Sequence, residues 1–498
     1  MKTSIAIAFS SLVVSANVVL AQSGSLGIFS ANRDIGSPSH AGSVALNPAI
    51  GTYLITGGGS NLWGRTDNFQ FVYREMSGDL SFSADVRWPK PGGNPHRKAI
   101  LMIRQTLDMD SPYVDVALHG VGLTALQFRE TKGGNTQETQ SSFSGPARIG
   151  IEKRGDYVSF WISTRGEELH PAGGSFKLPF TGQYYVGLVV CAHDDTTTEQ
   201  AEFSKVELKA LPPLAANARG EVQSTLEFMP VASTDRTIIF HTNVNIQAPN
   251  WTKNNELIFN GGGRLYRIGI TNGTAPTPIE IPEVSNINND HGISPDGSRL
   301  AISAGNPSRI YVGPIGGGAF QLVTPTGPSY FHGWSPDGRT LAFCGQRNDN
   351  FDVYTIPAAG GDEKRLTTAP GLDDGPEYSP DGQYIYFNSE RSGLMQIWRM
   401  KADGSEQTQM TPNDDQNNWF AHISPDGRRM VFLTFGKEVK PNDHPANKDV
   451  ALRMMAASGG PITTLAKFFG GQGTINVASW SPDSRNIAFV TYTTIYPK

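Results

Sequence analysis

Apolar and polar residues alternate along most of the chain, in short segments separated by Gly- and Pro-rich turns. Between residues 27 and 209 the alternating segments are FQFVYREM, LSFSADVRW, KAILMIRQTL, YVDVALHG, LTALQFRE, YVSFWIST, YYVGLVVCAH and EFSKVEL. A period of two puts one face of each segment inward and the other outward, which is typical of β-strands. Strong helical periodicity is absent. We therefore expect two antiparallel sheets packed face to face, a β-sandwich.

A second pattern follows residue 220 and repeats. The recurring text is HGISPDGSRLAIS, HGWSPDGRTLAFC, PEYSPDGQYIYFN, AHISPDGRRMVFL and ASWSPDSRNIAFV, preceded by a degenerate copy, PNWTKNNELIFNG. Aligned positions in the copies are 42, 41, 44, 45 and 57 residues apart, at Thr252, Ser294, Ser335, Ser379, Ser424 and Ser481. A period of about 40–45 residues is typical of β-propellers, in which each copy forms a four-stranded blade.

The SPDG sequence predicts the turn between the first and second strands of each blade. Pro sets φ for the turn, Asp accepts hydrogen bonds from backbone amides, and Gly takes a left-handed conformation. The last copy stops after its second strand, near Tyr492. Two strand-like segments before the first copy, STLEFMPV and RTIIFHT, would complete that blade and close the ring. The expected count is six blades over residues 221–498.

The N-terminus reads MKTSIAIAFSSLVVSANVVLAQ, in which one lysine precedes a run of apolar and small residues. This pattern predicts a secretory signal peptide, residues 1–21, and hence a secreted protein, extracellular or periplasmic. The alternative, an uncleaved membrane anchor, is less favoured because serines and an asparagine interrupt the run. Paired prolines and small residues in LKALPPLAANARG indicate an interdomain linker at residues 210–220.

Composition narrows the range of partners. The 55 glycines and 33 prolines suit many short strands joined by tight turns. Charged residues make up 17 % of the chain, the net charge is −5 and no basic stripe is present, so nucleic acid is not an expected partner. No later stretch is apolar for long enough to span a membrane.

Cys191 and Cys344 fall in different units, which does not favour a disulfide between them. We expect the protein to be a monomer.

Two resemblances support this all-β organisation. The stretch YLITGGGSNLWGRTDNFQFVYREMSGDLSFSADV, followed by KAILMIRQTL, resembles the concanavalin A-like (laminin G-like) sandwiches. The SPDG repeats are similar to the TolB-like propellers. The resemblances imply an N-terminal concanavalin A-like sandwich at residues 27–209 and a C-terminal six-bladed propeller at residues 221–498. Many such sandwiches bind sugars, and such propellers serve as scaffolds, binders and enzymes.

Polar side chains gather where the propeller channel is expected to open. The loop that precedes each SPDG strand and the loop between the second and third strands open on the same side of a blade ring. The first kind of loop contains Asp290, His291, His332, Asp373, Asp374, Glu377, Asn417, Asn418, Trp419, His422, Gln472 and Asn476. The second kind contains Arg347, Asp349, Glu390, Arg391, His444, Lys448 and Asp449.

The repeated register of three histidines suggests that they converge on the channel axis. Histidine and carboxylate side chains can hold a divalent cation such as Mn, Ca or Zn, or supply an acid and a base. The expected catalytic residues are His291, His332, His422 and Glu377, and the expected metal ligands are the same three histidines. The alternative is that these histidines cap the channel or bind loop carbonyls.

The pattern is also similar to oligogalacturonate lyases, seven-bladed propellers with SPDG-like turns and a histidine-held divalent metal. This resemblance implies a lyase or hydrolase acting on a polysaccharide or oligosaccharide. The expected substrate-binding residues are Arg347, Arg391, Trp419, His444, Lys448 and Asp374; the arginines would pair with a substrate carboxylate. The competing hypothesis is a non-catalytic TolB-type platform that binds a protein or a glycan.

Overall fold

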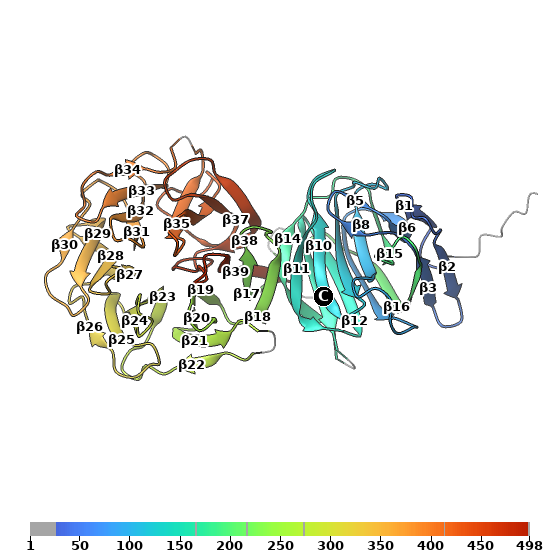
Figure 1. The fold of residues 1–498 in the computed structure, drawn as a ribbon, viewed down its shortest axis with the longest axis horizontal. Coiled ribbons are helices and arrows are strands. Elements are labelled where there is room, and N and C mark those ends of the chain that lie inside the picture. Colours follow the sequence, from blue (N-terminus) through green and yellow to red (C-terminus); the bar gives the residue numbers. More distant parts are fainter. Residues whose placement is uncertain (1–25, 165–166, 216–217, 272–273, 413, 497–498) are drawn as a thin grey trace, which may run out of the picture.

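The protein is built from β-strands arranged as two bodies side by side, a layered N-terminal unit and a ring of sheets (Figure 1). The computed structural model describes residues 26–164, 167–215, 218–271, 274–412 and 414–496. The predicted signal peptide lies outside the described residues. Within these ranges no helix has the length and apolar character needed to cross a membrane.

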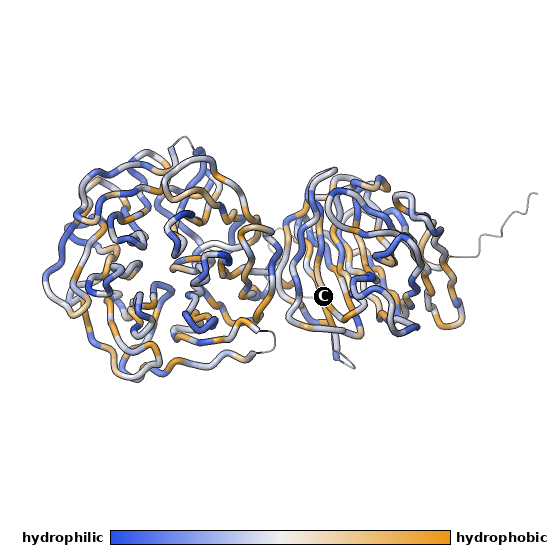
Figure 2. Tube along the Cα trace, viewed as in Figure 1, coloured by the Kyte–Doolittle hydropathy of each residue, from blue (hydrophilic) through white to orange (hydrophobic). Residues whose placement is uncertain are grey.

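The N-terminal unit consists of two sheets that face each other across a shared core. Buried side chains from both sheets meet there, including Phe82, Leu101, Ile151 and Phe203. Figure 2 shows the alternation of hydrophobic and hydrophilic residues along these strands. In spatial order the first sheet contains β1 (Ala31–Ile35), β6 (Phe69–Met76), β15 (Tyr184–Cys191), β8 (Lys98–Arg104), β9 (Tyr113–His119), β10 (Leu123–Arg129) and β11 (Gln137–Ser144). The second contains β14 (His170–Lys177), β13 (Tyr157–Ser163), β12 (Arg148–Arg154), β7 (Asp79–Arg87), β16 (Glu199–Leu211), β3 (Thr52–Gly57) and β2 (Ser43–Asn47).

Each alternating segment of the N-terminal unit forms a strand, because burial of its apolar face against the opposite sheet fixes the pattern. The short strands β4 (Leu62–Trp63) and β5 (Thr66–Asp67) pair with each other. Asp67 is fully buried and forms ion pairs with Arg104 and Arg129. The concanavalin A-like assignment of these two sheets stays a prediction.

The ring contains five separate four-stranded sheets among the described residues. They are β19 (Ile246–Trp251), β20 (Glu256–Gly261), β21 (Arg264–Gly269) and β22 (Thr277–Ile279); β23 (Ile287–Ile293), β24 (Arg299–Ala304), β25 (Arg309–Pro314) and β26 (Gln321–Leu322); β27 (Ser329–Trp334), β28 (Thr340–Arg347), β29 (Asn350–Pro357) and β30 (Lys364–Arg365); β31 (Asp373–Tyr378), β32 (Tyr384–Ser389), β33 (Gln396–Lys401) and β34 (Thr408–Gln409); and β35 (Asn417–Ile423), β36 (Arg429–Phe435), β37 (Ala446–Ala456) and β38 (Thr463–Gly471).

The SPDG sequences lie between the first and second strands of a blade, as predicted. In the copy between β23 and β24, the Ser294 hydroxyl donates to Asp296 Oδ1 at 2.5 Å and accepts from the Arg299 amide at 2.9 Å. The same serine-to-aspartate hydrogen bond recurs in the later copies. The turn is therefore stabilised by side chains that the repeat itself supplies.

The expected sixth blade does not form a sheet of its own, so the sheets give five blades rather than six. The predicted closing strands are present as β17 (Glu221–Pro230) and β18 (Arg236–Thr242), and β17 pairs with the last strand, β39 (Asn486–Ile495). These strands continue into the N-terminal unit, because β18 also pairs in parallel with β11. The result is one ten-stranded sheet that runs from β1 to β39 across both units.

This shared sheet joins the two units by more than the linker. Arg236, at the start of β18, forms a buried bidentate ion pair with Glu227 at 2.7 and 2.8 Å. Its guanidinium also lies over the rings of Phe176 in β14 and of Phe468 and Phe489 in the ring. Aromatic side chains from both units therefore pack around one charged pair.

Both cysteines are free and buried. Cys191 ends β15 in the N-terminal unit, and Cys344 lies in β28 of the ring. This agrees with the expectation that the two residues do not pair.

Candidate functional site

The innermost strand of every four-stranded blade carries an irregularity in its pairing. In β27, Phe331 and Gly333 pair with consecutive residues of β28, which leaves His332 as the extra residue. Comparable register shifts occur in β19, β23, β31 and β35. A β-bulge breaks the alternation of side chains along a strand and re-aims those that follow. The bulges therefore decide which side chains reach the centre of the ring.

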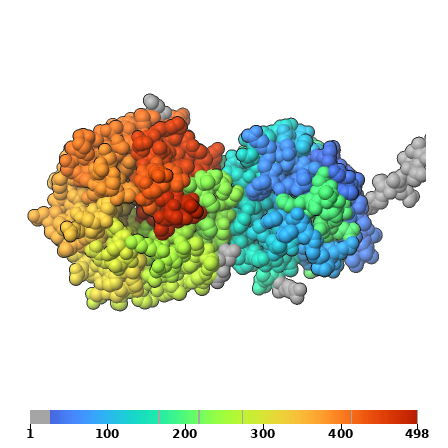
Figure 3. All heavy atoms as spheres, viewed as in Figure 1, coloured from blue at the N-terminus to red at the C-terminus, as the bar shows by residue number. Residues whose placement is uncertain are grey.

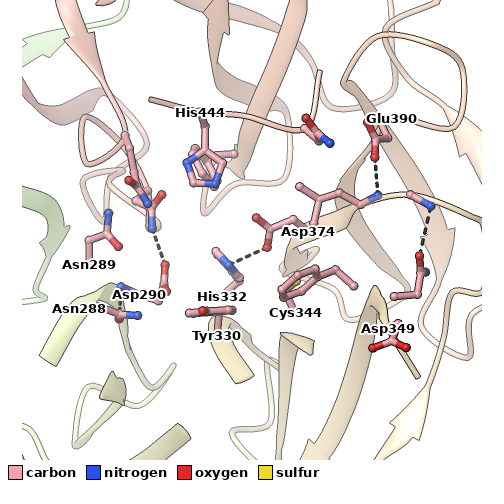
Figure 4. A pocket seen from close by; sticks show the side chains of 18 residues that line it. Asn288, Asn289, Asp290, Tyr330, His332, Cys344, Asp349, Asp374, Glu390 and His444 are labelled. Atoms are coloured by element: carbon pink, nitrogen blue, oxygen red, sulfur yellow. Dashed lines mark hydrogen bonds and ion pairs between the residues drawn. The ribbon is translucent and has the colours of Figure 1, made fainter. Parts of the chain in front are cut away.

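A cavity of about 580 Å³ lies at this centre. Figure 3 shows the hollow in the middle of the ring, and Figure 4 shows the side chains around it. Many of its residues come from the bulged segments and the loops beside them. The lining residues are Asn288, Asn289, Asp290, Tyr330, His332, Cys344, Asp349, Asn350, Phe351, Gly371, Leu372, Asp374, Glu390, Phe420, Asn442, His444, Gln472 and Asn476.

Three ionisable side chains from three successive blades meet in the cavity. His332 Nε2 lies 3.1 Å from Asp374 Oδ1. Asp290 accepts a hydrogen bond from the Asn476 amide, 2.6 Å from Asn476 Nδ2 to Asp290 Oδ1. In Figure 4 Asp290, His332 and Asp374 lie next to one another across the cavity. The arrangement places an imidazole between two carboxylates.

The surroundings shift the pKa values of Asp290 and Asp374 in opposite directions. Burial raises the pKa of Asp290 to about 6, although His332 opposes that shift. Burial alone would also raise the pKa of Asp374, but the nearby His332 outweighs it and holds that pKa at about 2. For His332 burial lowers the pKa, but Asp374 and then Asp290 raise it overall. Asp374 and His332 therefore form the charged pair, and Asp290 titrates close to neutral pH.

Aromatic rings and a second histidine complete the cavity wall. The Phe420 ring stacks on His332, with 6.2 Å between ring centroids and 19° between planes. Phe420 lies in the β35 bulge and has a left-handed backbone, with φ of 54°. His444, from the long insertion after β36, packs edge-on against Trp419 at 4.5 Å. Burial lowers the pKa of His444, so this imidazole is neutral at pH 7.

His422 and Glu377 do not line the cavity; they pair with each other inside the wall. His422 Nδ1 lies 2.6 Å from Glu377 Oε2, and its other ring nitrogen contacts the carbonyl oxygen of Ile475. The second carboxylate oxygen of Glu377 accepts the Ile423 amide at 2.9 Å. Since both ring nitrogens already face oxygen atoms, His422 offers neither a free base nor a metal ligand in this conformation.

His291 is buried in the blade rather than exposed to the cavity. Burial lowers its pKa to about 4, so it is neutral at pH 7. The structure thus does not bring His291, His332 and His422 together, although they hold nearby positions relative to the SPDG turns. The physical reason is that the bulges differ in size or position: β23 has two extra residues, β27 has one at His332, and β35 has one before His422.

The predicted substrate-binding residues divide into two groups. Asp374 and His444 line the cavity. The others do not: Arg347 pairs with Glu363 at 2.8 Å, Arg391 pairs with Asp373 at 2.7 Å, and Lys448 lies on the exposed part of β37. Trp419 is fully buried, so it supports His444 and Phe420 from behind and presents no ring face to a ligand.

No group of three or more His, Cys, Asp or Glu side chains lies in a metal-binding arrangement within the described parts of the chain. In the cavity, His332 Nε2 and Asp374 Oδ1 lie within ion-pair distance of each other. The other carboxylates of the cavity lining belong to Asp290, Asp349 and Glu390. A divalent metal at this site stays a prediction.

Several cavity residues were outside the predicted site. Asn288, Asn289, Tyr330, Phe351 and Phe420 belong to the same inner strands and loops as the predicted residues. The NINND sequence before His291 gave a usable signal, because a run of amide and acidic side chains is unusual at the start of a strand. Phe420 carried no such signal, since an aromatic residue in a strand is most often part of the core.

Comparison with known proteins identifies the family to which the propeller is similar. The family model PD40, described as TolB beta propeller domain, matches residues 290–458. An uncharacterized protein of Agrobacterium fabrum is 41% identical over 283 residues, which make up 56% of this chain and 96% of that protein. The chain belongs to the TolB β-propeller family.

A solved structure agrees with this membership. The structure of a putative TolB from Agrobacterium tumefaciens is 41% identical, with a TM-score of 0.53, and the match covers 55% of this chain and all of that one. An oligogalacturonate lyase in complex with manganese is 13% identical, covers 50% of this chain and 75% of its own, and has a TM-score of 0.34. The likeness to the lyase is too low to carry an argument about activity. The two Agrobacterium proteins are matched over 96% and 100% of their own lengths, but these matches cover only 56% and 55% of this TolB-family chain.

Proposed function

We propose that this protein is a non-catalytic binding platform, exported from the cytoplasm, that takes a segment of a protein partner into the cavity at the centre of its propeller. The observation that carries the proposal is the composition of the cavity wall. It presents side-chain amides, carboxylates and aromatic rings around a space of about 580 Å³. A concave site of this size with a few convergent polar groups suits a ligand of a few side chains.

Cleavage of an acidic glycan fits the wall less well. A uronic acid needs a cation at its carboxylate, but Arg347 and Arg391 are engaged with Glu363 and Asp373. No Lys or Arg belongs to the described lining of the cavity. An anionic substrate would therefore meet carboxylates and no fixed positive side chain apart from His332.

One observation keeps hydrolysis of a neutral glycan as a second candidate. Asp290 has a raised pKa of about 6 and Asp374 a lowered pKa of about 2 in the same cavity. A protonated and an ionised carboxyl group are the acid and base that glycoside hydrolysis requires. In that scheme Asp290 would donate a proton to the leaving oxygen, and Asp374, oriented by His332, would act from the other side of the bond.

A peptide-display selection against the purified protein tests the binding function. We expect selected peptides to bind the wild type and to lose at least about tenfold in affinity when Asn442→Trp fills the cavity mouth. Lys253→Trp is the matched control, because Lys253 is exposed beside the SPDG turn of the second blade, away from the cavity lining. Peptide binding that is unaffected by Asn442→Trp, or turnover of a neutral glycan that is abolished by Asp374→Asn, would overturn the proposal.

A further inference from the structure

We propose that the group held in this cavity is an organic cation, a lysine ammonium or arginine guanidinium of the partner segment, bound at Asp290 and the side-chain amide oxygen of Asn476. The inference rests on the proposed binding function and names the chemistry of its guest. It follows from the charges that line the cavity, from unsatisfied hydrogen-bond acceptors in its wall, and from the aromatic rings beside them.

The cavity carries an excess of negative charge. Its described lining contains the carboxylates of Asp290, Asp349, Asp374 and Glu390 but neither Lys nor Arg, and of its two histidines His444 is neutral at pH 7. Asp290 and Asp374 are the deepest of the four, at 6 and 8 % exposure. Asp374 is paired with His332. Burying Asp290 without a cationic partner of its own is costly, so a guest with a positive charge would be favoured beside it.

Several buried or half-buried carboxylates outside the cavity pair with arginine, each within hydrogen-bond distance. These pairs are Glu227 with Arg236, Asp352 with Arg365, Glu363 with Arg347, and Asp373 with Arg391. In the cavity, Asp374 has His332 as its cationic partner, whereas Asp290 has no Lys or Arg beside it in the described lining. Asp290 is therefore the buried carboxylate that can pair with a cation from outside.

The deep wall also contains a hydrogen-bond acceptor without a donor. Asn476 uses its amide nitrogen to hold Asp290, which turns the amide oxygen into a buried acceptor. That oxygen has no hydrogen-bond partner among the described residues, and Asn476 is only 2 % exposed. A guanidinium presents five N–H donors and an ammonium three, so either can satisfy the Asn476 oxygen and an adjacent carboxylate together.

Aromatic rings stand beside these acceptors. Tyr330 and Phe351 line the cavity with 6.4 Å between their ring centroids, and Phe420 covers His332. The face of an aromatic ring attracts a cation. The chain uses this contact repeatedly, as where Arg391 lies 4.9 Å above the ring of Trp398. Carboxylates with aromatic faces suit an organic cation better than a metal ion, which needs its ligands closer together.

Titration calorimetry with N-acetyl-arginine amide tests the inference, with N-acetyl-citrulline amide as the neutral analogue of the same shape. We expect the arginine amide to bind at least about tenfold more tightly than the citrulline amide. Asp290→Asn and Asp374→Asn should each weaken arginine amide binding about tenfold or more. Asp415→Asn is the matched control, because this exposed carboxylate does not line the cavity, and it should leave binding unchanged.

Three results would overturn the inference: equal binding of the two amides, no binding of the arginine amide at millimolar concentration, or displacement of the arginine amide by calcium chloride at micromolar concentration, which would assign the site to a metal ion. Circular dichroism of each variant establishes that it is folded, and two independent carboxylate variants protect the test against one that is not. If peptides from the display selection still need an open cavity but bind without a basic residue, the cation inference fails while the binding function stands.

Discussion

His332 and Asp374 face each other from adjacent blades, with 3.1 Å between His332 Nε2 and Asp374 Oδ1. Each side chain stands at a bulge of its strand, β27 or β31. The pair is the one ion pair formed between two side chains of the described cavity lining. It fixes the imidazole at the centre of the ring, and its titration gives the first prediction.

The His332–Asp374 pair should stabilise the fold in a pH-dependent way. The folded protein holds the His332 proton more tightly than the unfolded chain, since the His332 pKa is raised. The stabilisation is therefore complete below the ordinary histidine pKa of about 6.5 and is lost as the pH rises through the raised value. We expect His332→Gln to lower the free energy of unfolding by about 1–3 kcal/mol at pH 6 and by clearly less at pH 9. Urea unfolding across this range measures the difference, and a difference that does not change with pH would contradict the assignment.

Asp290→Asn should stabilise the protein at neutral pH. The pKa of Asp290 is raised to about 6, so keeping this carboxylate ionised above pH 6 costs stability. The amide removes that cost, and we expect a gain of about 1–3 kcal/mol at pH 7.5, reduced by any strain in the Asn476 contact. The gain should vanish as the pH falls below the ordinary aspartate pKa of about 4, because Asp290 is then protonated in both states. Thermal unfolding at pH 4 and pH 7.5 tests both parts; a loss of stability at pH 7.5 would show that the charge is needed for the fold.

Removing one partner of the Arg236–Glu227 pair should be strongly destabilising. Arg236→Met leaves Glu227 fully buried without its guanidinium, which costs about 3–5 kcal/mol. The double variant Arg236→Met/Glu227→Gln removes both charges and should recover most of that loss. Denaturant unfolding of the two variants gives the coupling directly. Additive losses in the double variant would mean that the pair contributes only packing.

Cutting the chain before β17 should produce a ring that associates with itself. In the whole protein β18 pairs with β11, so residues 221–498 alone would expose that edge of the sheet. An open edge with unpaired amides and carbonyls is a template for another chain. We expect light scattering to report dimers or larger species for the truncated protein, and a monomer for the full chain at equal concentration. A monomeric truncated ring would mean that another segment covers β18.

Elemental analysis of the purified protein tests the predicted divalent metal. The observed positions of His291, His332 and His422 lead us to expect less than about one tenth of a metal ion per chain after dialysis, because no shared coordination point exists among them. His332→Ala/Asp374→Ala serves as the matched variant. Near-stoichiometric Mn, Ca or Zn in the wild type, lost in this variant, would restore the metal-dependent interpretation.

Much of the fold follows from the sequence because it rests on local chemistry. The alternating segments between residues 27 and 209 form strands, and each SPDG turn is built from its own Ser, Asp and Gly. The pairing of β17 with β39 also follows, since a propeller that left its first and last strands unpaired would expose two edges. The parallel contact between β11 and β18 could not be foreseen, because nothing in either strand specifies a partner about 100 residues away.

The candidate site was likewise predictable from the sequence only in part. The sequence determined that acidic, amide and histidine side chains would gather where the inner strands enter the ring, and Asp290, His332, Asp374 and His444 are there. Only the tertiary structure decided which neighbours of these residues turn into the wall, as His422 does towards Glu377. The reason is geometric: one extra residue in a strand reverses the direction of every side chain beyond it, and the position of that residue depends on how neighbouring blades pack.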